Sequence, residues 1–455
     1  MLSFYEVFDK FLKGPHVVEM DYDLDFDEKL RTIVNKYGIK YDPENPIPQD
    51  DQLADNVFAA GLEFYENIGS YCVDTLRVAK FTKREIFEAL AEAPQEPVFG
   101  KGKDARKLIA RPPESSFRPW FFVGSAGAAV TDEQVLSNVV EGYGLVPYAN
   151  SITTPSITKI SGRPIIAKTP LEILGAIRTV EVSKAALRKA GRSGMPIMNA
   201  ISTATSDAAK IAGSQFGLNP TDGLMVGSMS ELKMDFQRLN EIAYAVHSGI
   251  NIVAESGPLL GGYCGGPEGV AVANVAYHVQ AILVQRGAAH FTFPIHFKFS
   301  SNTSRNLLWT TSISNQALSR NSKFPLLTSG ILASGPGTEM CFYENAARTI
   351  ATCVSGGGIL AVGLAKNVQT DHLTPWDPKF SIEVALASLG MKREDANEIV
   401  KGLLSKYESK IPEAPIGKSF QELFNMESLE PNNEYYDLYH RMKDEMSRWG
   451  LIFAT

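Results

Sequence analysis

Short apolar runs alternate with longer amphipathic segments along most of the chain after residue 115. Eight of these runs have the length of a buried strand. Because parallel strands need a long crossover connection, short strands alternating with helices indicate parallel pairing. The eight runs are PWFFVG (119–124), LVPYANS (145–151), MPIMNA (195–200), GLMVGSM (223–229), INIVAES (250–256), FTFPIHF (291–297), PLLTSGIL (325–332) and ILAVGLAK (359–366).

Several of the intervening segments carry clear helix signals. Thr169 and Pro170 begin a helix that runs to about Lys189, and Gly191 ends it. Further helices are predicted over 231–246, 270–285, 305–318 and 339–353. Eight strand–helix units favour an α/β fold of the (βα)₈ TIM-barrel type. An open doubly wound sheet is the alternative, but VGSAGAAV (123–130) matches its glycine fingerprint only in part.

The segments on either side of the predicted barrel are helical and charged. We therefore predict an N-terminal, mainly helical extension over 1–115, the barrel over 116–395, and a C-terminal helical extension over 396–455 packed on the barrel. The polar stretch GKGKDARKLIARPP (100–113) follows no clear strand and lacks the GK[ST] ending of a phosphate loop. It is expected to be a hairpin or a linker.

Composition narrows the choice of partners and compartment. The 455 residues are 44% hydrophobic and carry a net charge of −7, without a basic block, so a nucleic-acid partner is not expected. We expect no signal peptide and no membrane span, because charged residues interrupt every apolar stretch. The four cysteines make no CxxC pair, which predicts reduced thiols in the cytoplasm and no tightly bound metal.

The C-terminal ends of the predicted strands offer the candidate site residues, because TIM-barrel active sites lie at that end. Period-two alternation puts Glu255 on one face with Asn251 and Val253, and makes it the catalytic candidate. A structural ion pair between a glutamate and a lysine is the competing interpretation. The other strand ends offer Met198 and Asn199 on the third strand, Thr292, Pro294, His296 and Lys298 on one face of the sixth, Leu327, Ser329 and Ile331 on the seventh, and Lys366 on the eighth.

Glycine-rich loops follow two of these strands. ESGPLLGGYCGGPEG (255–269) contains six glycines after the strand-end carboxylate, which indicates close approach of its backbone to another molecule. GPGTEMC (335–341) leads into a helix whose N-terminus can face a ligand. Aromatic side chains that we consider as walls of a pocket for a cation are Phe121, Phe122, Tyr148, Phe293 and Trp309.

Five segments resemble, in order and spacing, the monomethylamine methyltransferases of methanogens. They are YCVDTLRVAKFT (71–82), SELKMDFQRLNEI (230–242), GGYCGGPE (261–268), GPGTEMC (335–341) and APIGKSFQELF (414–424), and the similarity extends from about residue 55 to the C-terminus. The resemblance implies a (βα)₈ barrel that assembles as a homo-oligomer, a hexamer in that family. It also implies transfer of a methyl group from methylamine to the cobalt of a separate corrinoid protein.

The resemblance also exposes a difference. The family carries pyrrolysine, whose ring imine captures the amine, and the alignment through GRSGM places that residue at Met198. The family's glutamate corresponds to Glu255, whereas its glutamine and tyrosine correspond to Ser329 and Ile331. Methionine forms no covalent adduct with an amine. The substitutions imply a rebuilt pocket, lined by Met198, Asn199, Ser329, Ile331 and His296, and a different substrate.

Three functions are consistent with these residues. The favoured one is a pyrrolysine-independent methyltransferase that moves a methyl group from a small, N-methylated donor to a corrinoid (cobalamin) carried by a partner protein. Docking of that protein is expected at the loop containing Gly261, Gly262, Gly265 and Gly266. The alternatives are a Schiff-base lyase that uses Lys298, and a catalytically silent barrel that binds a corrinoid protein.

Overall fold

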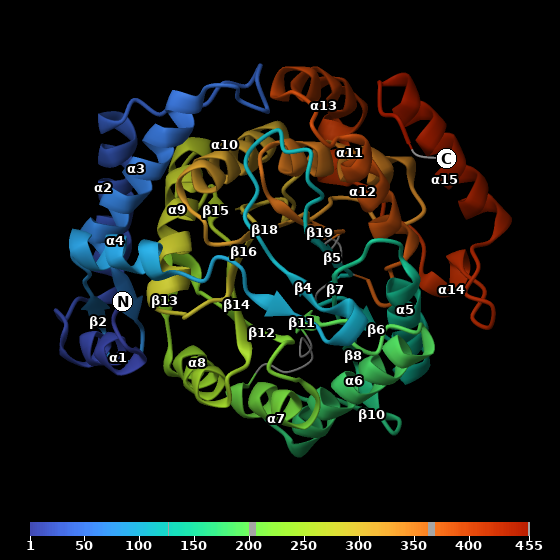
Figure 1. Ribbon diagram of the computed structural model, residues 1–455, viewed down its shortest axis with the longest axis horizontal. Coiled ribbons are helices and arrows are strands. Elements are labelled where there is room, and N and C mark those ends of the chain that lie inside the picture. Colours follow the sequence, from blue (N-terminus) through green and yellow to red (C-terminus); the bar gives the residue numbers. More distant parts are fainter. Residues whose placement is uncertain (126, 200–205, 363–368, 454–455) are drawn as a thin grey trace.

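The computed structural model describes residues 1–125, 127–199, 206–362 and 369–453. Its centre is a parallel sheet of eight strands in the hydrogen-bonded order β11-β7-β5-β19-β18-β16-β14-β12, curved into a nearly closed barrel (Figure 1). This confirms the predicted TIM-barrel fold. The strands in chain order are β5 (Phe121–Val123), β7 (Ser151–Thr153), β11 (Ile197–Asn199), β12 (Gly223–Gly227), β14 (Asn251–Ser256), β16 (Ala289–Thr292), β18 (Leu326–Ser329) and β19 (Gly358–Ala361).

One helix follows each barrel strand and covers the outside of the sheet. Polar side chains fix where several of these helices begin: Asp132, Asp235 and Thr338 each accept a hydrogen bond from a backbone N–H of the first turn. The helices are α5 (Glu133–Leu145), α6 (Pro170–Lys189), α7 (Asp207–Gly217), α8 (Phe236–Ser248), α9 (Pro267–Leu283), α10 (Arg305–Asn321), α11 (Glu339–Val354) and α12 (Trp376–Ala387).

The barrel closes differently between β11 and β12 than between its other strands. Within the described residues these two strands share no backbone ladder. The buried carboxylate of Asp222 bridges the gap, accepting a hydrogen bond from the Ile197 backbone N–H at 2.8 Å and pairing with Lys184 at 2.7 Å. Gly223 also approaches the backbone of Met198 so closely that a Cβ would lie 3.2 Å from its Cα.

Alternate residues of the strands point into the barrel and fill it. The buried interior includes Met198, Met225, Val253, Phe291 and Leu327, which pack in one hydrophobic cluster. The residue after an interior one points to the helices: the hydroxyl of Thr328 donates to the side-chain amide of Asn315 in α10, and that of Thr292 donates to Asn274 in α9. The alternation predicted for the fifth strand is confirmed by Val253, which is interior.

The N-terminal end of the barrel is covered by a hairpin. Its strands are β3 (Val98–Phe99) and β4 (Arg106–Lys107), and it lies across the ring of strands in Figure 1. Phe99 and Leu108 belong to the same hydrophobic cluster as the barrel interior. The stretch expected to be a hairpin or a linker is therefore a hairpin that closes the floor of the barrel.

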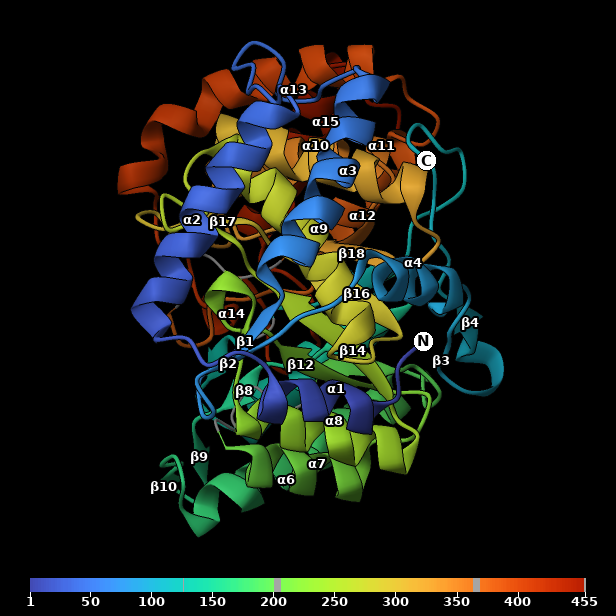
Figure 2. The ribbon, with the colours of Figure 1, turned by 90° about the vertical axis from the view of Figure 1, so that its left-hand side faces the viewer.

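The N-terminal helices α2, α3 and α4 pack on one side of the barrel, where α3 contacts α9 and α10, and α1 lies against β2 (Figure 2). Gly61 allows α3 to approach α9 closely, since a Cβ there would lie 2.4 Å from Cβ of Val275. A three-stranded sheet, β13-β1-β2, joins this layer to the barrel. The elements are α1 (Phe4–Lys13), α2 (Glu19–Lys36), α3 (Asp51–Ile68), β1 (Ser70–Cys72), β2 (Arg77–Ala79), α4 (Lys83–Glu92) and β13 (Lys233–Met234).

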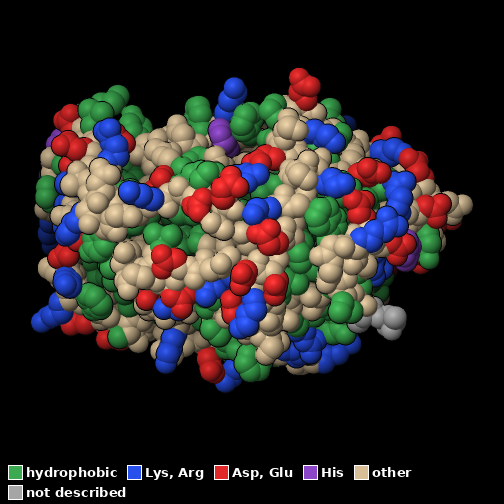
Figure 3. All heavy atoms as spheres, turned by 90° about the horizontal axis from the view of Figure 1, so that it is seen from above, with side chains coloured by type: hydrophobic (Ala, Val, Ile, Leu, Met, Phe, Trp, Pro, Cys, Tyr) green, Lys and Arg blue, Asp and Glu red, His purple; other side chains and the backbone are tan. Residues whose placement is uncertain are grey.

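The C-terminal helices cover α11 and α12. The buried carboxylate of Asp377 in α12 connects the layers, accepting hydrogen bonds from Thr374 Oγ1 at 2.7 Å and from the Tyr435 hydroxyl at 2.9 Å. The helices are α13 (Arg393–Tyr407), α14 (Phe420–Leu423) and α15 (Asn433–Arg448). On the face seen in Figure 3, basic, acidic and apolar side chains are interspersed.

Three predicted boundaries are wrong. The run 145–151 is not a strand: α5 ends at Leu145, and β7 begins only at Ser151. The run 291–297 is shifted, because β16 spans Ala289–Thr292 and Pro294, which lacks an N–H donor, follows its end. The helix expected from residue 231 begins at Phe236, since Glu231 has φ 57°.

Neither a membrane-spanning helix nor a cluster of metal-binding side chains occurs within the described ranges. No helix there is long and apolar enough to cross a membrane. No group of three or more His, Cys, Asp or Glu side chains is arranged to hold a metal ion in the same part of the chain. The four cysteines are buried and free.

Candidate active site at the C-terminal end of the barrel

Glu255 lies at the C-terminal end of β14, on the interior face of the barrel. The neighbouring strand makes room for it, since a Cβ on Gly227 would lie 3.4 Å from Oε2 of Glu255. The side chain is partly buried, and no hydrogen bond or ion pair to its carboxylate is found within the described residues. Burial raises the pKa of this carboxyl above its ordinary value, and the charges of Lys210 and Arg238 offset the rise only in part.

The nearby cations are already paired with other carboxylates. Lys210 Nζ lies 2.6 Å from Oε2 of Glu241 and donates to the Met225 carbonyl oxygen at 3.2 Å. Arg238 forms an ion pair with Asp235. The ion-pair interpretation of Glu255 therefore finds no partner in the described part of the chain, and Lys366, at the predicted end of the eighth strand, lies outside it.

Met198 and Asn199 end β11 beside the gap in the barrel. The Met198 side chain is fully buried and packs in the interior cluster, so it forms part of the floor beneath the strand ends. The strand is irregular here, because the register with β7 shifts between Ile197 and Asn199. The Asn199 carbonyl oxygen accepts a hydrogen bond from the Thr154 backbone N–H at 2.9 Å, and the Asn199 residue itself is half-buried.

Ser329 and Ile331 are held in place by a residue that the sequence did not single out. Asn302 donates from its side-chain amide to the Ser329 carbonyl oxygen at 2.9 Å, and its Oδ1 accepts the Ile331 N–H at 2.7 Å. A third hydrogen bond joins the Asn302 N–H to the Ile331 carbonyl oxygen at 2.9 Å. Asn302 therefore extends the sheet beyond the end of β18. The one sequence signal that could have identified Asn302 is its position shortly after the sixth predicted strand.

A buried arginine supports the same strand end. Arg348 of α11 donates from Nη2 to the Leu360 carbonyl oxygen at 2.6 Å, while its buried Nε and Nη1 have no hydrogen-bond partner among the described residues. A Cβ on Gly330 would lie 2.1 Å from Nε of Arg348, so the glycine is required for this contact. Desolvation lowers the pKa of the guanidinium to about 9. No motif in the sequence identifies this residue.

Of the five aromatic side chains considered as walls, Phe293 lies nearest the carboxylate level. It follows β16, and its ring packs against Gly257, where a Cβ would lie 2.6 Å from Cε2. Phe122 is part of the barrel interior. Trp309 lies in α10 and contacts Tyr41, and Tyr148 lies at the opposite end of the barrel under Arg118.

His296 and Lys298 lie on the rim rather than in the barrel. The expected shared face with Thr292 is wrong, because β16 ends at Thr292 and His296 belongs to a separate short strand, β17 (Ile295–His296), paired with β15 (Leu259–Leu260). Lys298 is exposed, with Nζ 5.6 Å from the Phe299 ring centroid. A Schiff-base lysine needs a desolvated or activated amine, so the lyase hypothesis gains no support from this position.

The glycine-rich loop after β14 forms a tight turn on the rim. The Gly261 N–H donates to the Gly265 carbonyl oxygen at 3.0 Å, and these two residues have φ values of 87° and 66°. A side chain at Gly265 would meet nothing within 4 Å, whereas one at Gly266 would meet Glu268. Gly265 therefore presents open backbone on the rim, in the loop that follows the strand carrying Glu255.

The segments that carry the family resemblance meet in pairs. Segment 71–82 forms β1 and β2, and β1 pairs with β13 of segment 230–242. Gly335 of segment 335–341 packs against segment 414–424, where a Cβ would lie 1.6 Å from the Ile416 carbonyl oxygen. Part of the resemblance therefore reflects contacts between loops, which demand small residues.

Comparison with known proteins agrees with this architecture. The chain matches the sequence profile of the family Monomethylamine methyltransferase MtmB over residues 2–451. It is 31% identical over 454 residues to MtmB2 of Methanosarcina acetivorans and to MtmB1 of Methanosarcina barkeri, covering 99% of this chain and 98% of each relative. The crystal structure of Methanosarcina barkeri MtmB superimposes with a TM-score of 0.95 at 30% identity, over 99% of this chain and 98% of that one. The chain therefore belongs to the monomethylamine methyltransferase MtmB family.

Proposed function

We propose that this chain transfers a methyl group from a small, N-methylated cationic donor to the cobalt of a corrinoid protein, and that it does so without pyrrolysine. Membership of a methyltransferase family supports the reaction class. The observation that supports the rest of the proposal is the carboxylate of Glu255 at the end of β14, which has no hydrogen-bond or ion-pair partner among the described residues and lies above a floor that includes the buried Met198.

The chemistry of the transfer explains why such a site would suffice. The lone pair of cobalt(I) attacks the methyl carbon, a carbon–cobalt bond forms, the carbon–nitrogen bond breaks, and its electron pair remains on nitrogen. A quaternary ammonium donor leaves as a neutral tertiary amine, so no covalent capture of the amine is needed. The protein then has to bind the cation, orient the methyl group and exclude water.

Each proposed pocket residue has a role that follows from its position. Glu255 attracts the cationic donor, and the Phe293 ring offers a cation–π surface nearby. Ser329 and Ile331, held by Asn302, line the side of the pocket, with Asn199 on the opposite edge. His296 faces a hollow on the rim with Tyr41 and Glu408, so its proposed contact is with a substrate or partner at the rim.

The proposed partner is a corrinoid protein that docks on the rim. The proposed docking loop contains Gly261, Gly262, Gly265 and Gly266, and the open backbone at Gly265 supports close approach of a large planar group. We also propose that the chain acts in the cytoplasm as a homo-oligomer, for which the hexamer expected from the family resemblance is the first assembly to examine. Analytical ultracentrifugation of the purified chain measures that assembly.

The test of the proposal is a methyl-transfer assay with reduced cobalamin and a panel of quaternary, tertiary, secondary and primary methylamines. We expect at least one cationic donor to methylate cobalt(I), and borohydride treatment of the enzyme to leave the rate unchanged, since Met198 has no imine to reduce. Turnover that borohydride abolishes in the presence of a carbonyl substrate would instead support the lyase. Absence of transfer from every donor to every acceptor would contradict the proposal.

A further inference from the structure

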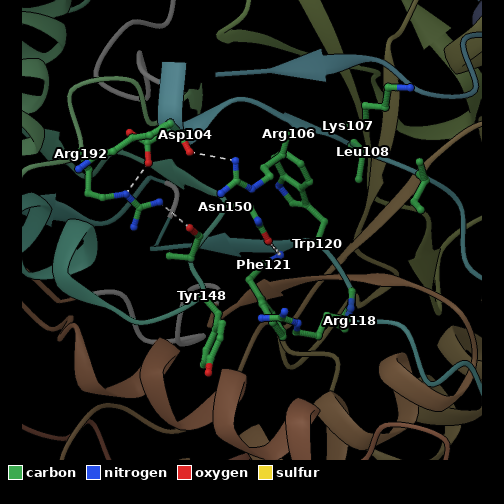
Figure 4. Close-up of a pocket in the computed structure, with 14 residues that line it drawn as sticks. Asp104, Arg106, Lys107, Leu108, Arg118, Trp120, Phe121, Tyr148, Asn150 and Arg192 are labelled. Carbon is green, nitrogen blue, oxygen red and sulfur yellow. Dashed lines mark hydrogen bonds and ion pairs between the residues drawn. The ribbon is translucent and has the colours of Figure 1, made fainter. Parts of the chain in front are cut away.

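A second hollow lies at the opposite end of the barrel from the candidate active site. Its volume is 610 Å³, and Figure 4 shows its lining. Pro119, Trp120 and Phe121 lead into β5, Asn150 immediately precedes β7, and Arg192 precedes β11, so the hollow is at the N-terminal end of the strands. The β3–β4 hairpin supplies the remaining wall. The volume is in the range of small-molecule sites.

The lining is strongly basic, although the chain as a whole has a net charge of −7. It contains five cationic side chains against a single carboxylate. This excess is local, since no other basic block stands out in the sequence. The charged residues that line the hollow are Lys103, Asp104, Arg106, Lys107, Arg118 and Arg192.

The ion pairs of the lining leave three cations uncompensated. Arg192 Nε lies 2.6 Å from Oδ1 of the buried Asp104, which neutralises the one carboxylate. Lys107 is paired with Glu96 at 2.7 Å, outside the hollow. For the other three cations, Lys103, Arg106 and Arg118, no carboxylate lies within ion-pair distance among the described residues.

Two of these cations are held in fixed orientations. Arg106 Nη1 donates to the carbonyl oxygens of Lys103 at 2.9 Å and Ala105 at 2.7 Å, which leaves its other N–H groups available. Arg118 lies over the Tyr148 ring, 4.9 Å from its centroid. Tyr148 itself has φ 64°, a conformation that costs free energy for a tyrosine and is often found at functional sites.

We propose that this hollow is a binding site for a small organic polyanion, one that carries two or more phosphate or carboxylate groups. The guanidinium groups of Arg106 and Arg118 provide planar donors that suit both kinds of anion, and Lys103 adds a mobile charge at the edge. Asn150 lies between them in Figure 4 and is fixed by accepting the Phe121 N–H at 2.8 Å. This site is independent of the methyl-transfer proposal, because it lies at the other end of the barrel.

The experiment is isothermal titration calorimetry on the full-length chain with inorganic tripolyphosphate, adenosine triphosphate, citrate and orthophosphate. The site variant is Arg106→Gln with Arg118→Gln, both exposed positions. The matched control is Lys323→Gln, an exposed cation that precedes β18 at the same end of the barrel and does not line the hollow. Thermal unfolding without ligand verifies that both variants fold as the wild type does.

We expect at least one polyanion to bind about tenfold more tightly than orthophosphate, and the site variant to weaken that binding by about tenfold or more. Lys323→Gln should change it less than about twofold. Tighter binding of the phosphates than of citrate would identify a phosphorylated ligand, and the reverse order a polycarboxylate. Absence of saturable binding below about 1 mM, or equal weakening in the control, would overturn the proposal.

Discussion

Replacement of Glu255 by glutamine is the sharpest test of its role, because function and stability should change in opposite directions. The carboxylate is partly buried and has neither an ion-pair partner nor a hydrogen-bond donor in the described part of the chain. Its raised pKa indicates that the fold disfavours the charged form. A neutral amide of the same shape removes that unfavourable charge together with the proposed attraction for a cationic donor.

The size of the expected change in Tm follows from the free-energy cost of desolvating the Glu255 carboxylate. A buried polar group without a partner costs about 1 to 3 kcal/mol, and a partly exposed one falls at the lower end of that range. With an unfolding entropy of about 2 cal/mol/K per residue, 1 kcal/mol shifts the Tm of a 455-residue chain by about 1 °C. We therefore expect Glu255→Gln to raise Tm by about 1 to 2 °C. Turnover should fall by about a hundredfold or more, as on removal of a single electrostatic stabiliser.

The stability gain should depend on pH. A carboxyl whose pKa is raised in the folded state adds stability that is fully present below its unfolded-state pKa and is lost as pH rises through the folded-state pKa. The wild type therefore loses this contribution as pH rises, and the glutamine variant does not. The difference in Tm between the two proteins should be close to zero at acidic pH and should grow toward alkaline pH.

The assay is differential scanning calorimetry across pH together with methyl transfer per folded molecule. Glu114→Gln is the matched control: Glu114 is also partly buried, but it is paired with Lys392 at 2.9 Å and its pKa is lowered to about 2, so its replacement should lower Tm near neutral pH. A lower Tm for Glu255→Gln with near-normal turnover would show that Glu255 stabilises the fold and does not bind the donor.

Three further predictions test other parts of the structure. Gly265→Trp should abolish transfer to the corrinoid protein but spare transfer to free cobalt(I) cobalamin, because the side chain points into open space on the rim; no loss with either acceptor would contradict the docking site. Asp222→Ala should cost about 3 kcal/mol in denaturant unfolding, since it leaves the buried Ile197 N–H and the half-buried Lys184 without their partner, whereas Glu181→Ala, which breaks an exposed pair, should cost less than about 1 kcal/mol. Burial raises the pKa of Asp377 to about 6, so the wild type should lose about 2 kcal/mol relative to Asp377→Asn between pH 4 and pH 7; a constant difference in unfolding free energy across that range would refute this.

The barrel could be predicted from the sequence because each buried strand leaves an apolar run and each crossover helix leaves capping signals. The misplaced boundaries have local causes. Leu145 ends α5, and the apolar residues just after it continue the pattern of a strand that begins only at Ser151. Period-two alternation places His296 on the face of Thr292 only if one strand continues through Pro294. The strand ends at Thr292, so this expected face for His296 is wrong.

The sequence identifies a site residue only where the role of that residue follows from its position in its own strand. Glu255 follows from its place at the end of β14 and from alternation along that strand. Asn302, Asp222 and Arg348 were missed because each acts on a segment to which sequence gives no link: Asn302 on residues 329–331, Asp222 on Ile197, and Arg348 on Leu360. Their contacts exist only once the barrel has formed.

The proposal that this family member transfers methyl groups without pyrrolysine can be tested in one experiment. Protein whose mass confirms methionine at position 198 is incubated with cobalt(I) corrinoid protein and either monomethylamine or a quaternary methylammonium donor. We predict methylation of cobalt by the quaternary donor and none above background by monomethylamine. Rapid methylation of cobalt by monomethylamine with this protein would contradict the proposed change of substrate.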